Sequence, residues 1–260
     1  MPRKNFKNEK IECSFREGIK SGEYIFESHC HPQYELIAVF SGSVTVVIEG
    51  GKRELRKGEM AIIPPLYYHS IYTDGGRDYK RLTALFSDSF VPKEIREDFA
   101  QSIGAHFVSA SNSLYHVLDG VRGAFSEPNV EKYGALIESY LTEALYIHTY
   151  KSHTESEAKT NPRVKLITEY IDSHIVEKFC LDDMAESLFI SKSTLCHIFK
   201  EEMKTSVKQY VLQKKLSYAA KLIGEGMGAT AAASAVGYEN YANFYKMYKK
   251  IFGESPSGRG

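Results

Sequence analysis

Two short segments in the last third of the chain carry polar, aromatic and cationic side chains at helical spacing. In each segment, apolar residues at positions i, i+3 and i+4 define a buried face, so the remaining side chains face outward. Hydroxyl, imidazole and ammonium groups on such a face suit contact with phosphates and base edges in the major groove of DNA. The outward side chains are Lys192, Ser193, Cys196, His197 and Lys200 in the first segment and Tyr241, Ala242, Tyr245, Lys246 and Lys249 in the second.

The elements around these segments predict two helix-turn-helix units. In each unit a short helix carries a small residue, Ala185 or Ala233, at its contact point. A brief turn then ends at a side chain that caps the next helix, Ser191 or Asn240. A single copy of this pattern also occurs in helical bundles that have no role in DNA binding. Two copies in register favour a pair of DNA-reading units instead.

The last hundred residues resemble the AraC/XylS family of bacterial transcription regulators. The matching positions include the Phe-Lys pair at 199–200, the Gly-Tyr pair at 237–238 and the Tyr-Lys-Lys run at 248–250. The resemblance implies two helix-turn-helix units on one long connecting helix. It also implies two recognition helices that enter major-groove segments about 34 Å apart on one face of the duplex. The apolar face expected on the connecting helix comprises Val207, Val211, Leu216, Ala219 and Leu222.

Some positions depart from the family pattern. Lys204 stands where the family favours Gly after the first recognition helix, and Ala229 and Ala232 stand where it favours larger aliphatic residues. Replacing Ile by Ala in a core forgoes two or three methylenes, at about 0.8 kcal/mol each. The second unit is therefore expected to be less stable than is usual in the family.

The N-terminal part of the chain has a different periodicity. Up to about residue 90, short alternating runs separated by Gly, Pro and Asp predict antiparallel strands in a sandwich or barrel, with a hairpin at Gly50-Gly51. Residues 91–150 have a helical period, and their apolar stripe indicates packing against the strands or, alternatively, a dimer interface. Residues 151–162 are polar, end in Asn-Pro and predict a linker before the DNA-binding domain at 163–260.

The strand-rich region contains His29, His31 and Glu35 in one segment and His69 in another. These spacings resemble the two cupin motifs, although Leu66 stands where cupins favour Gly. In cupins that hold metal, the resemblance assigns these four residues as ligands, a set of three nitrogens and one oxygen that suits a divalent transition metal. Cupin-like sensors also keep such residues as hydrogen-bonding supports without metal, and we favour that interpretation, with no cofactor.

Without metal, the same groups are expected to line the mouth of the barrel as a binding site for a small polar molecule such as a sugar. Tyrosines near the motifs would contribute aromatic and polar walls to this site. The expected ligand-binding residues are Tyr24, His29, His31, Tyr34, Glu35, Tyr67 and His69.

The composition agrees with an α+β protein that has a cupin-like barrel followed by helices and an all-α C-terminal domain. The chain is 43% hydrophobic and 25% charged, which excludes disordered and fibrous classes. Its start has no apolar run, so we expect no signal peptide, no membrane segment and a cytoplasmic protein. The four cysteines lack paired spacing and are expected to be reduced thiols.

The leading hypothesis is a homodimeric regulator that binds promoter DNA, a small-molecule effector and RNA polymerase, and that is not an enzyme. The first alternative is a metal-dependent cupin enzyme with an accessory DNA-binding domain. The second is a DNA-binding protein whose barrel only dimerises. Residues 161–260 carry 14 Lys and Arg against 11 Asp and Glu, an excess that permits contact with phosphates without requiring it.

Overall fold

A computed structural model describes residues 3–19, 28–73, 78–101, 106–151 and 161–259. Its contacts divide the chain into two compact units. The first contains all the strands and the helices up to Lys151. The second contains the helices from Pro162 onward, with the short segments Ser28–Pro32 and Glu49–Gly51 grouped with it. No helix among the described residues combines the length and hydropathy needed to cross a membrane.

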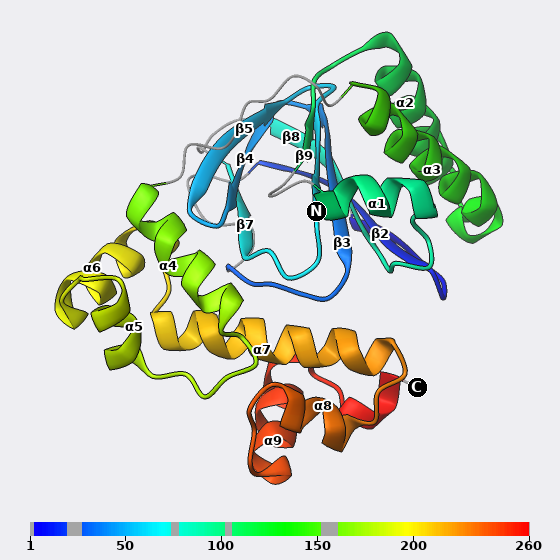
Figure 1. Ribbon diagram of the computed structural model, residues 1–260. Helices are drawn as coiled ribbons and strands as arrows, with labels where there is room; N and C mark the ends of the chain where they lie inside the picture. The colour runs from blue at the N-terminus through cyan, green and yellow to red at the C-terminus, as the bar shows by residue number, and fades with distance from the viewer. Residues whose placement is uncertain (1–2, 20–27, 74–77, 102–105, 152–160, 260) are drawn as a thin grey trace. The chain divides into compact units, whose positions relative to one another are not determined.

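The first unit contains two β-sheets (Figure 1). The larger sheet has the order β1-β2-β8-β3-β6-β9, the smaller has the order β5-β4-β7, and every pairing with a determined register is antiparallel. The predicted hairpin joins β4 and β5, with Glu49 and Gly50 in the left-handed region at its turn. The strands are β1 Arg3–Lys7, β2 Ile11–Ile19, β3 Tyr34–Ser41, β4 Ser43–Ile48, β5 Gly51–Arg56, β6 Met60–Ile63, β7 His69–Tyr72, β8 Asp78–Phe86 and β9 His106–Val108.

Strand β3 lies in the middle of the larger sheet and is buried on both faces. Because side chains alternate along a strand, its residues divide between two cores. Leu36 and Ala38 join the core that includes the helices, whereas Ile37 and Val39 join the core that includes β4 and β7. Glu35 has the parity of Ile37 and therefore faces the interior between the two sheets.

Three helices pack against the larger sheet. They are α1 Lys93–Gln101, α2 Asn112–Ser126 and α3 Gly134–Lys151, with a 3-10 turn at Val130–Tyr133. Helix α3 buries Ile137, Leu141 and Leu145 as its stripe predicts, but Leu136 is 43% exposed. The region at 91–150 is not wholly helical, because β9 pairs with β6 at the sheet edge. Three residues are too few to show a period in the sequence.

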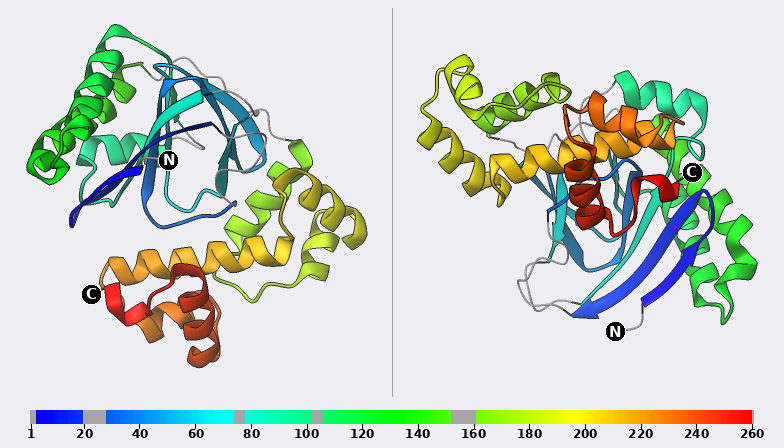
Figure 2. Two further views of the ribbon diagram at one scale, coloured as in Figure 1. Left: turned by 180° about the vertical axis from the view of Figure 1, so that it is seen from behind. Right: turned by 90° about the horizontal axis from the view of Figure 1, so that it is seen from below.

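The second unit is entirely helical apart from its connecting loops and the two short segments grouped with it. Its long helix α7 connects α4, α5 and α6 to α8 and α9 (Figure 2). The predicted apolar face of α7 is buried at Val207, Val211, Leu216 and Ala219, and Leu222 is half-buried. The helices are α4 Pro162–Ser173, α5 Leu181–Ser187, α6 Lys192–Met203, α7 Val207–Gly224, α8 Ala229–Ala235 and α9 Tyr241–Phe252, followed by a 3-10 turn at Pro256–Arg259.

Lys215 joins distant parts of this helical unit. Its Nζ donates hydrogen bonds to the carbonyl oxygen of Glu177, in the loop after α4, and to that of Val236, at the end of α8. Burial lowers the pKa of this ammonium group. The two carbonyl bonds satisfy a side chain that would otherwise be costly to bury.

Two of the departures from the family patterns keep the backbone conformation that Gly usually adopts. Lys204 ends α6 at φ 55°, and Leu66 has φ 70°. Both lie in the left-handed region, which L-residues adopt at a cost of roughly 1 kcal/mol. The turns themselves are therefore retained at these positions although the residue type differs.

Candidate DNA-binding surface and histidine cluster

Both presumed recognition helices begin at the predicted caps. The Ser191 hydroxyl accepts a hydrogen bond from the backbone N–H of Thr194 at 3.2 Å, and α6 follows. The Asn240 side-chain oxygen accepts one from the N–H of Asn243, also at 3.2 Å, and α9 follows. Each cap satisfies a backbone donor that the first helical turn leaves open.

The turns that precede these helices have the same backbone hydrogen bonds but different residues. The N–H of Ile190 bonds to the carbonyl of Ala185 at 3.0 Å, and that of Tyr238 bonds to the carbonyl of Ala233 at 3.0 Å. The residue before each donor is left-handed, Phe189 at φ 53° and Gly237 at φ 81°. The Phe189 side chain is 97% exposed, so it contributes no packing to offset its backbone conformation.

Helix α6 exposes most of the residues predicted for its outer face. Lys192, Ser193, His197 and Lys200 are exposed, and Cys196 is half-buried. The Nζ of Lys192 pairs with the carboxylate of Asp182 at 2.9 Å, and this hydrogen bond raises the pKa of Lys192. His197 lies 3.8 Å from the carboxylate of Glu201. Lys192 and His197 on this face therefore have acidic neighbours.

Helix α9 exposes Ala242, Tyr245, Lys246 and Lys249, as expected. Tyr241 is only half-buried and packs on Phe244, with ring centroids 5.8 Å apart, so the structure assigns it partly to the core. The sequence interpretation omitted Asn243 and Lys250, which are also exposed. The helical period alone would have found both, because neither falls on the i, i+3, i+4 face of the buried residues.

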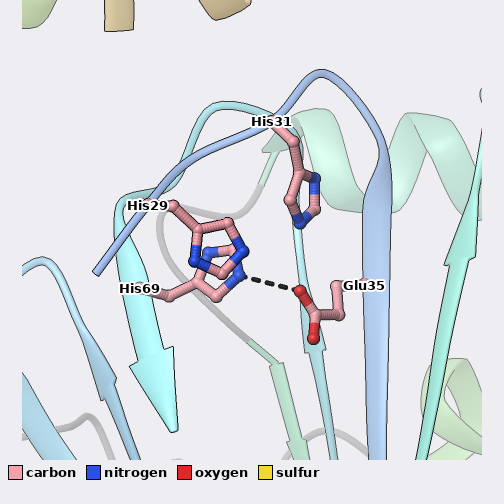
Figure 3. Close-up of side chains that lie close together, drawn as sticks. All are labelled: His29, His31, Glu35 and His69. Carbon is pink, nitrogen blue, oxygen red and sulfur yellow. Dashed lines mark hydrogen bonds and ion pairs between the residues drawn. The ribbon is translucent and has the colours of Figure 1, made fainter. Parts of the chain in front are cut away.

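The four motif residues of the N-terminal region lie together (Figure 3). One ligand atom from each of His29, His31, Glu35 and His69 lies within 4.8 Å of every other. Glu35 comes from β3 and His69 from β7, so the two sheets each contribute one buried member. His29 and His31 come from the segment that leads into β3, and His29 is partly exposed.

Hydrogen bonds fix the orientation of His69. Its Nδ1 lies 2.8 Å from the carbonyl oxygen of Tyr67, and its Nε2 lies 2.8 Å from a carboxylate oxygen of Glu35. The carbonyl can only accept, so Nδ1 carries hydrogen and donates to it. Nε2 therefore faces the carboxylate, and their 2.8 Å contact requires a proton on one of these two atoms.

Arg81 adds a buried positive charge near this cluster. The side chain is fully buried, and its guanidinium donates to the hydroxyl of Thr83 at 2.6 Å. Burial lowers the pKa of Arg81 to about 10, while the negative charge of Glu35 acts in the opposite direction. Arg81 is thus still a cation at neutral pH and partly balances Glu35.

The structure separates the predicted ligand-binding tyrosines. Tyr34 precedes Glu35 on β3 and points to the opposite face, where it stacks on Phe86 with centroids 5.7 Å apart. It therefore does not line the cluster, because neighbouring strand residues face opposite ways. Tyr67 packs against the inter-sheet core beside His69. Tyr24 lies outside the described residues.

Comparison with known proteins finds a matching family for each of the two compact units. Residues 17–145 match the family described as "AraC-like ligand binding domain", and residues 184–258 match a "Helix-turn-helix domain". The probable transcriptional regulator LumQ of Photobacterium leiognathi is 29% identical over 93 residues, which are 35% of this chain and 38% of LumQ. The regulator YdeC of Bacillus subtilis is 21% identical, with 88% of this chain and 84% of YdeC covered. The arabinose operon regulatory protein of Escherichia coli is 26% identical, with 48% and 44% covered.

Proposed function

Because the chain belongs to the AraC/XylS family of transcription regulators, we propose that it binds promoter DNA sequence-specifically under the control of a small polar molecule. The helical unit binds the DNA, and the strand-rich unit binds the effector. Binding of the effector alters transcription by favouring one functional state of the regulator over another. The protein acts in the cytoplasm, where it meets both promoter DNA and RNA polymerase.

The observation that carries this proposal is the pair of capped helices on one shared helix. Helices α6 and α9 each follow a short helix and a tight turn, and each exposes polar and cationic side chains. Helix α7 connects the two helix-turn-helix units. Two reading helices in one rigid frame suit two major-groove segments of one duplex.

The effector proposal rests on the polar groups between the two sheets. Interior positions of a β-sandwich are usually apolar, yet Glu35, His69 and Arg81 are all buried there. Hydroxyl groups of a sugar would bond to such carboxylate, imidazole and guanidinium groups. Tyr67 would supply an aromatic wall.

Dimer formation is part of the same proposal. Helix α3 leaves Leu136 exposed beside its buried stripe, so the side of α3 that carries Leu136 is available for contact with a second copy. Sedimentation of the full chain, compared with a Leu136→Glu variant, would test this contact. A variant as dimeric as the parent would remove Leu136 from the interface.

The DNA-binding proposal is tested by selecting bound fragments from the host genome and measuring their affinity by fluorescence anisotropy. We expect the full chain to prefer the selected fragments over random duplex at moderate salt by at least about 1,000-fold. Equal affinity for both duplexes would contradict sequence-specific regulation. Sugars are then added to the complex, and a change in affinity identifies the effector class.

A metal-dependent enzyme with an accessory DNA-binding domain is the second candidate, and the histidine cluster is the observation that favours it. This candidate predicts that His69→Ala abolishes turnover while DNA affinity is unchanged. The regulator proposal predicts no turnover in the parent protein. Assays of isomerase and dioxygenase activity on the metal-loaded protein separate the two.

A further inference from the structure

We propose that the strand-rich unit has a second ligand site, a basic pocket at the end of β3 that binds a phosphate monoester. The pocket lies where the end of β3, the turn between β5 and β6, and α2 meet. Its volume of about 440 Å³ falls in the range of pockets that hold small organic molecules. The buried groups assigned above to the effector, Glu35, His69 and Arg81, do not line it. The inference therefore goes beyond the proposed function and does not depend on it.

The backbone at the end of β3 is shaped by a bulge. The pairing of β3 with β8 shifts register between Val39 and Ser41, so Phe40 is the extra residue opposite β8. A bulge re-aims the side chains beside it, and bulges are over-represented next to active sites. The N–H of Gly58 donates a hydrogen bond to the carbonyl oxygen of Val39 at 2.7 Å. This bond holds the turn that carries Lys57 beside the bulge.

Tyr115 of α2 forms an aromatic wall of the pocket. Gly58 has φ 82°, and a Cβ at this position would lie 2.4 Å from the Tyr115 ring, so the ring can lie against the turn because the residue is glycine. The Tyr115 hydroxyl donates to the carbonyl oxygen of Lys57 at 3.3 Å. Tyr115 is nevertheless 38% exposed, which leaves part of the ring open to a ligand. Leu118, one turn further along α2, is buried and supplies an apolar floor.

Three cations and one carboxylate line the pocket and give its lining a net charge of +2. The cations are Lys57, Lys80 and Arg122, and the acid is Asp119. Arg122 pairs with Asp119 at 3.0 Å, and Lys80 pairs with Glu17 at 2.9 Å, but each of these side chains is at least 38% exposed. Exposed ion pairs are weak, so a more highly charged anion can displace the two carboxylates. The ammonium group of Lys57 has no partner among the residues that the structure describes.

A phosphate monoester matches these groups in charge and in shape. Its phosphate carries a charge of about −1.5 to −2 at neutral pH and has three acceptor oxygens. An arginine can bond to two of these oxygens at once, and lysines add point charges. A carboxylate has one charge and two oxygens, so it would use fewer of the three cations. The organic part of the ester would lie against Tyr115 and Leu118.

The test titrates the full chain with phenyl phosphate by calorimetry in the absence of DNA, so the result is independent of the regulator function. We expect one molecule to bind per chain. Its affinity should exceed those of inorganic phosphate, which lacks an apolar part, and of benzoate, which lacks the second charge, by about 10-fold each. Equal binding of either probe would overturn the inference. Tighter binding of glucose 6-phosphate than of phenyl phosphate would support it and assign the ester to a sugar.

Two variants remove one cation each from the pocket. Lys57→Ala and Arg122→Ala should each weaken phenyl phosphate binding by about 10-fold or more, because a hydrogen bond between charged groups is lost. Lys93→Ala removes an exposed lysine of α1 outside the pocket, and this matched control should bind as the parent does. Unchanged affinity in both pocket variants would overturn the inference. Loss of binding in a Lys246→Ala, Lys249→Ala variant would also overturn it, since the phosphate would then belong to α9.

A third variant separates the aromatic wall from the charges. Tyr115→Ala should weaken phenyl phosphate binding by about 10-fold and leave the affinity for inorganic phosphate unchanged, because only the ester contacts the ring. Tyr115→Phe keeps the ring and should retain the parent's affinity. Circular dichroism reports whether each variant is folded. An equal loss for both ligands in folded Tyr115→Ala would contradict contact between the ring and the organic part of the ester.

Discussion

The first helix-turn-helix unit, α5 with α6, and the second, α8 with α9, are capped alike but differ in charge. Helix α6 carries two lysines and two glutamates, whereas α9 carries three lysines and no acidic residue. Phosphate attraction supplies most of the sequence-independent affinity for DNA. We therefore expect α9, in the second helix-turn-helix unit, to provide more of this attraction than α6 in the first.

The two helix-turn-helix units also differ in how they are packed. Helix α5 buries Leu181 and Met184, whereas α8 buries only Ala232 and Ala233. The core of the second unit relies instead on aromatic residues of α9, Phe244 and Tyr248, which are fully buried. Four predictions test this comparison.

The largest effect is expected from removing a core aromatic ring. Phe244→Ala should lower the free energy of unfolding by about 3 to 5 kcal/mol, because small alanines on α8 cannot fill the cavity. Leu195→Ala, at the equivalent position of the first unit, should cost about 2 to 4 kcal/mol. Urea titration followed by helical circular dichroism measures both. A smaller loss for Phe244→Ala would show that α8 collapses onto α7.

Removing the ammonium group of Lys215 is expected to have the next largest effect. Lys215→Met leaves the carbonyl oxygens of Glu177 and Val236 without this donor, which should cost about 1 to 3 kcal/mol. Lys221→Met, at a half-exposed position of α7, is the control and should cost less than about 0.5 kcal/mol. Equal losses in the two variants would contradict a bracing role for Lys215.

The turns at Phe189 and Gly237 allow two substitutions with opposite expected effects on stability. Phe189→Gly should stabilise the protein by about 1 kcal/mol, because glycine adopts positive φ without strain and the phenyl ring packs on nothing. Gly237→Ala should destabilise it by a similar amount, with its new Cβ 3.2 Å from the Lys215 Nζ. Thermal melts measure both. If Phe189→Gly is neutral in stability yet weakens DNA binding, the ring is retained for contact with DNA.

The smallest effect is expected from single lysines on the reading helices. Lys246→Ala should reduce the slope of log affinity against log salt by about 0.9, the loss of one phosphate contact. Lys192→Ala should reduce it less, because Asp182 already pairs with that lysine. Anisotropy titrations on one promoter fragment at several salt concentrations measure both slopes. A larger change for Lys192→Ala would contradict the expectation that the second helix-turn-helix unit supplies more of the attraction to phosphates.

The helical unit could be predicted from the sequence because its signals are local and repeated. The caps at Ser191 and Asn240 and the burial of Phe199 and Tyr248 follow from residue types at fixed offsets. The role of Lys215 could not be predicted, since its two carbonyl partners are far away in the chain. Every residue type has a backbone carbonyl oxygen, so the sequence does not show which residues accept such a hydrogen bond.

The candidate site in the strands was only partly predictable. Motif spacing brought His29, His31, Glu35 and His69 into one group, and the structure places them together. Tyr34 was included with them, although alternation along β3 sends it to the opposite face from Glu35. The burial of Arg81 in the same interior was missed, because a cation in an alternating run normally indicates the solvent face.

The hydrogen bonds of Lys215 to the loop after α4 and to the end of α8 also bear on which promoters the protein can bind. Because the ammonium group and α7 join the two helix-turn-helix units, we expect neither unit to turn freely toward a displaced half of the operator. Inserting half a helical turn of base pairs between the two halves would carry one of them to the far side of the duplex. An operator altered in this way would engage one helix-turn-helix unit only.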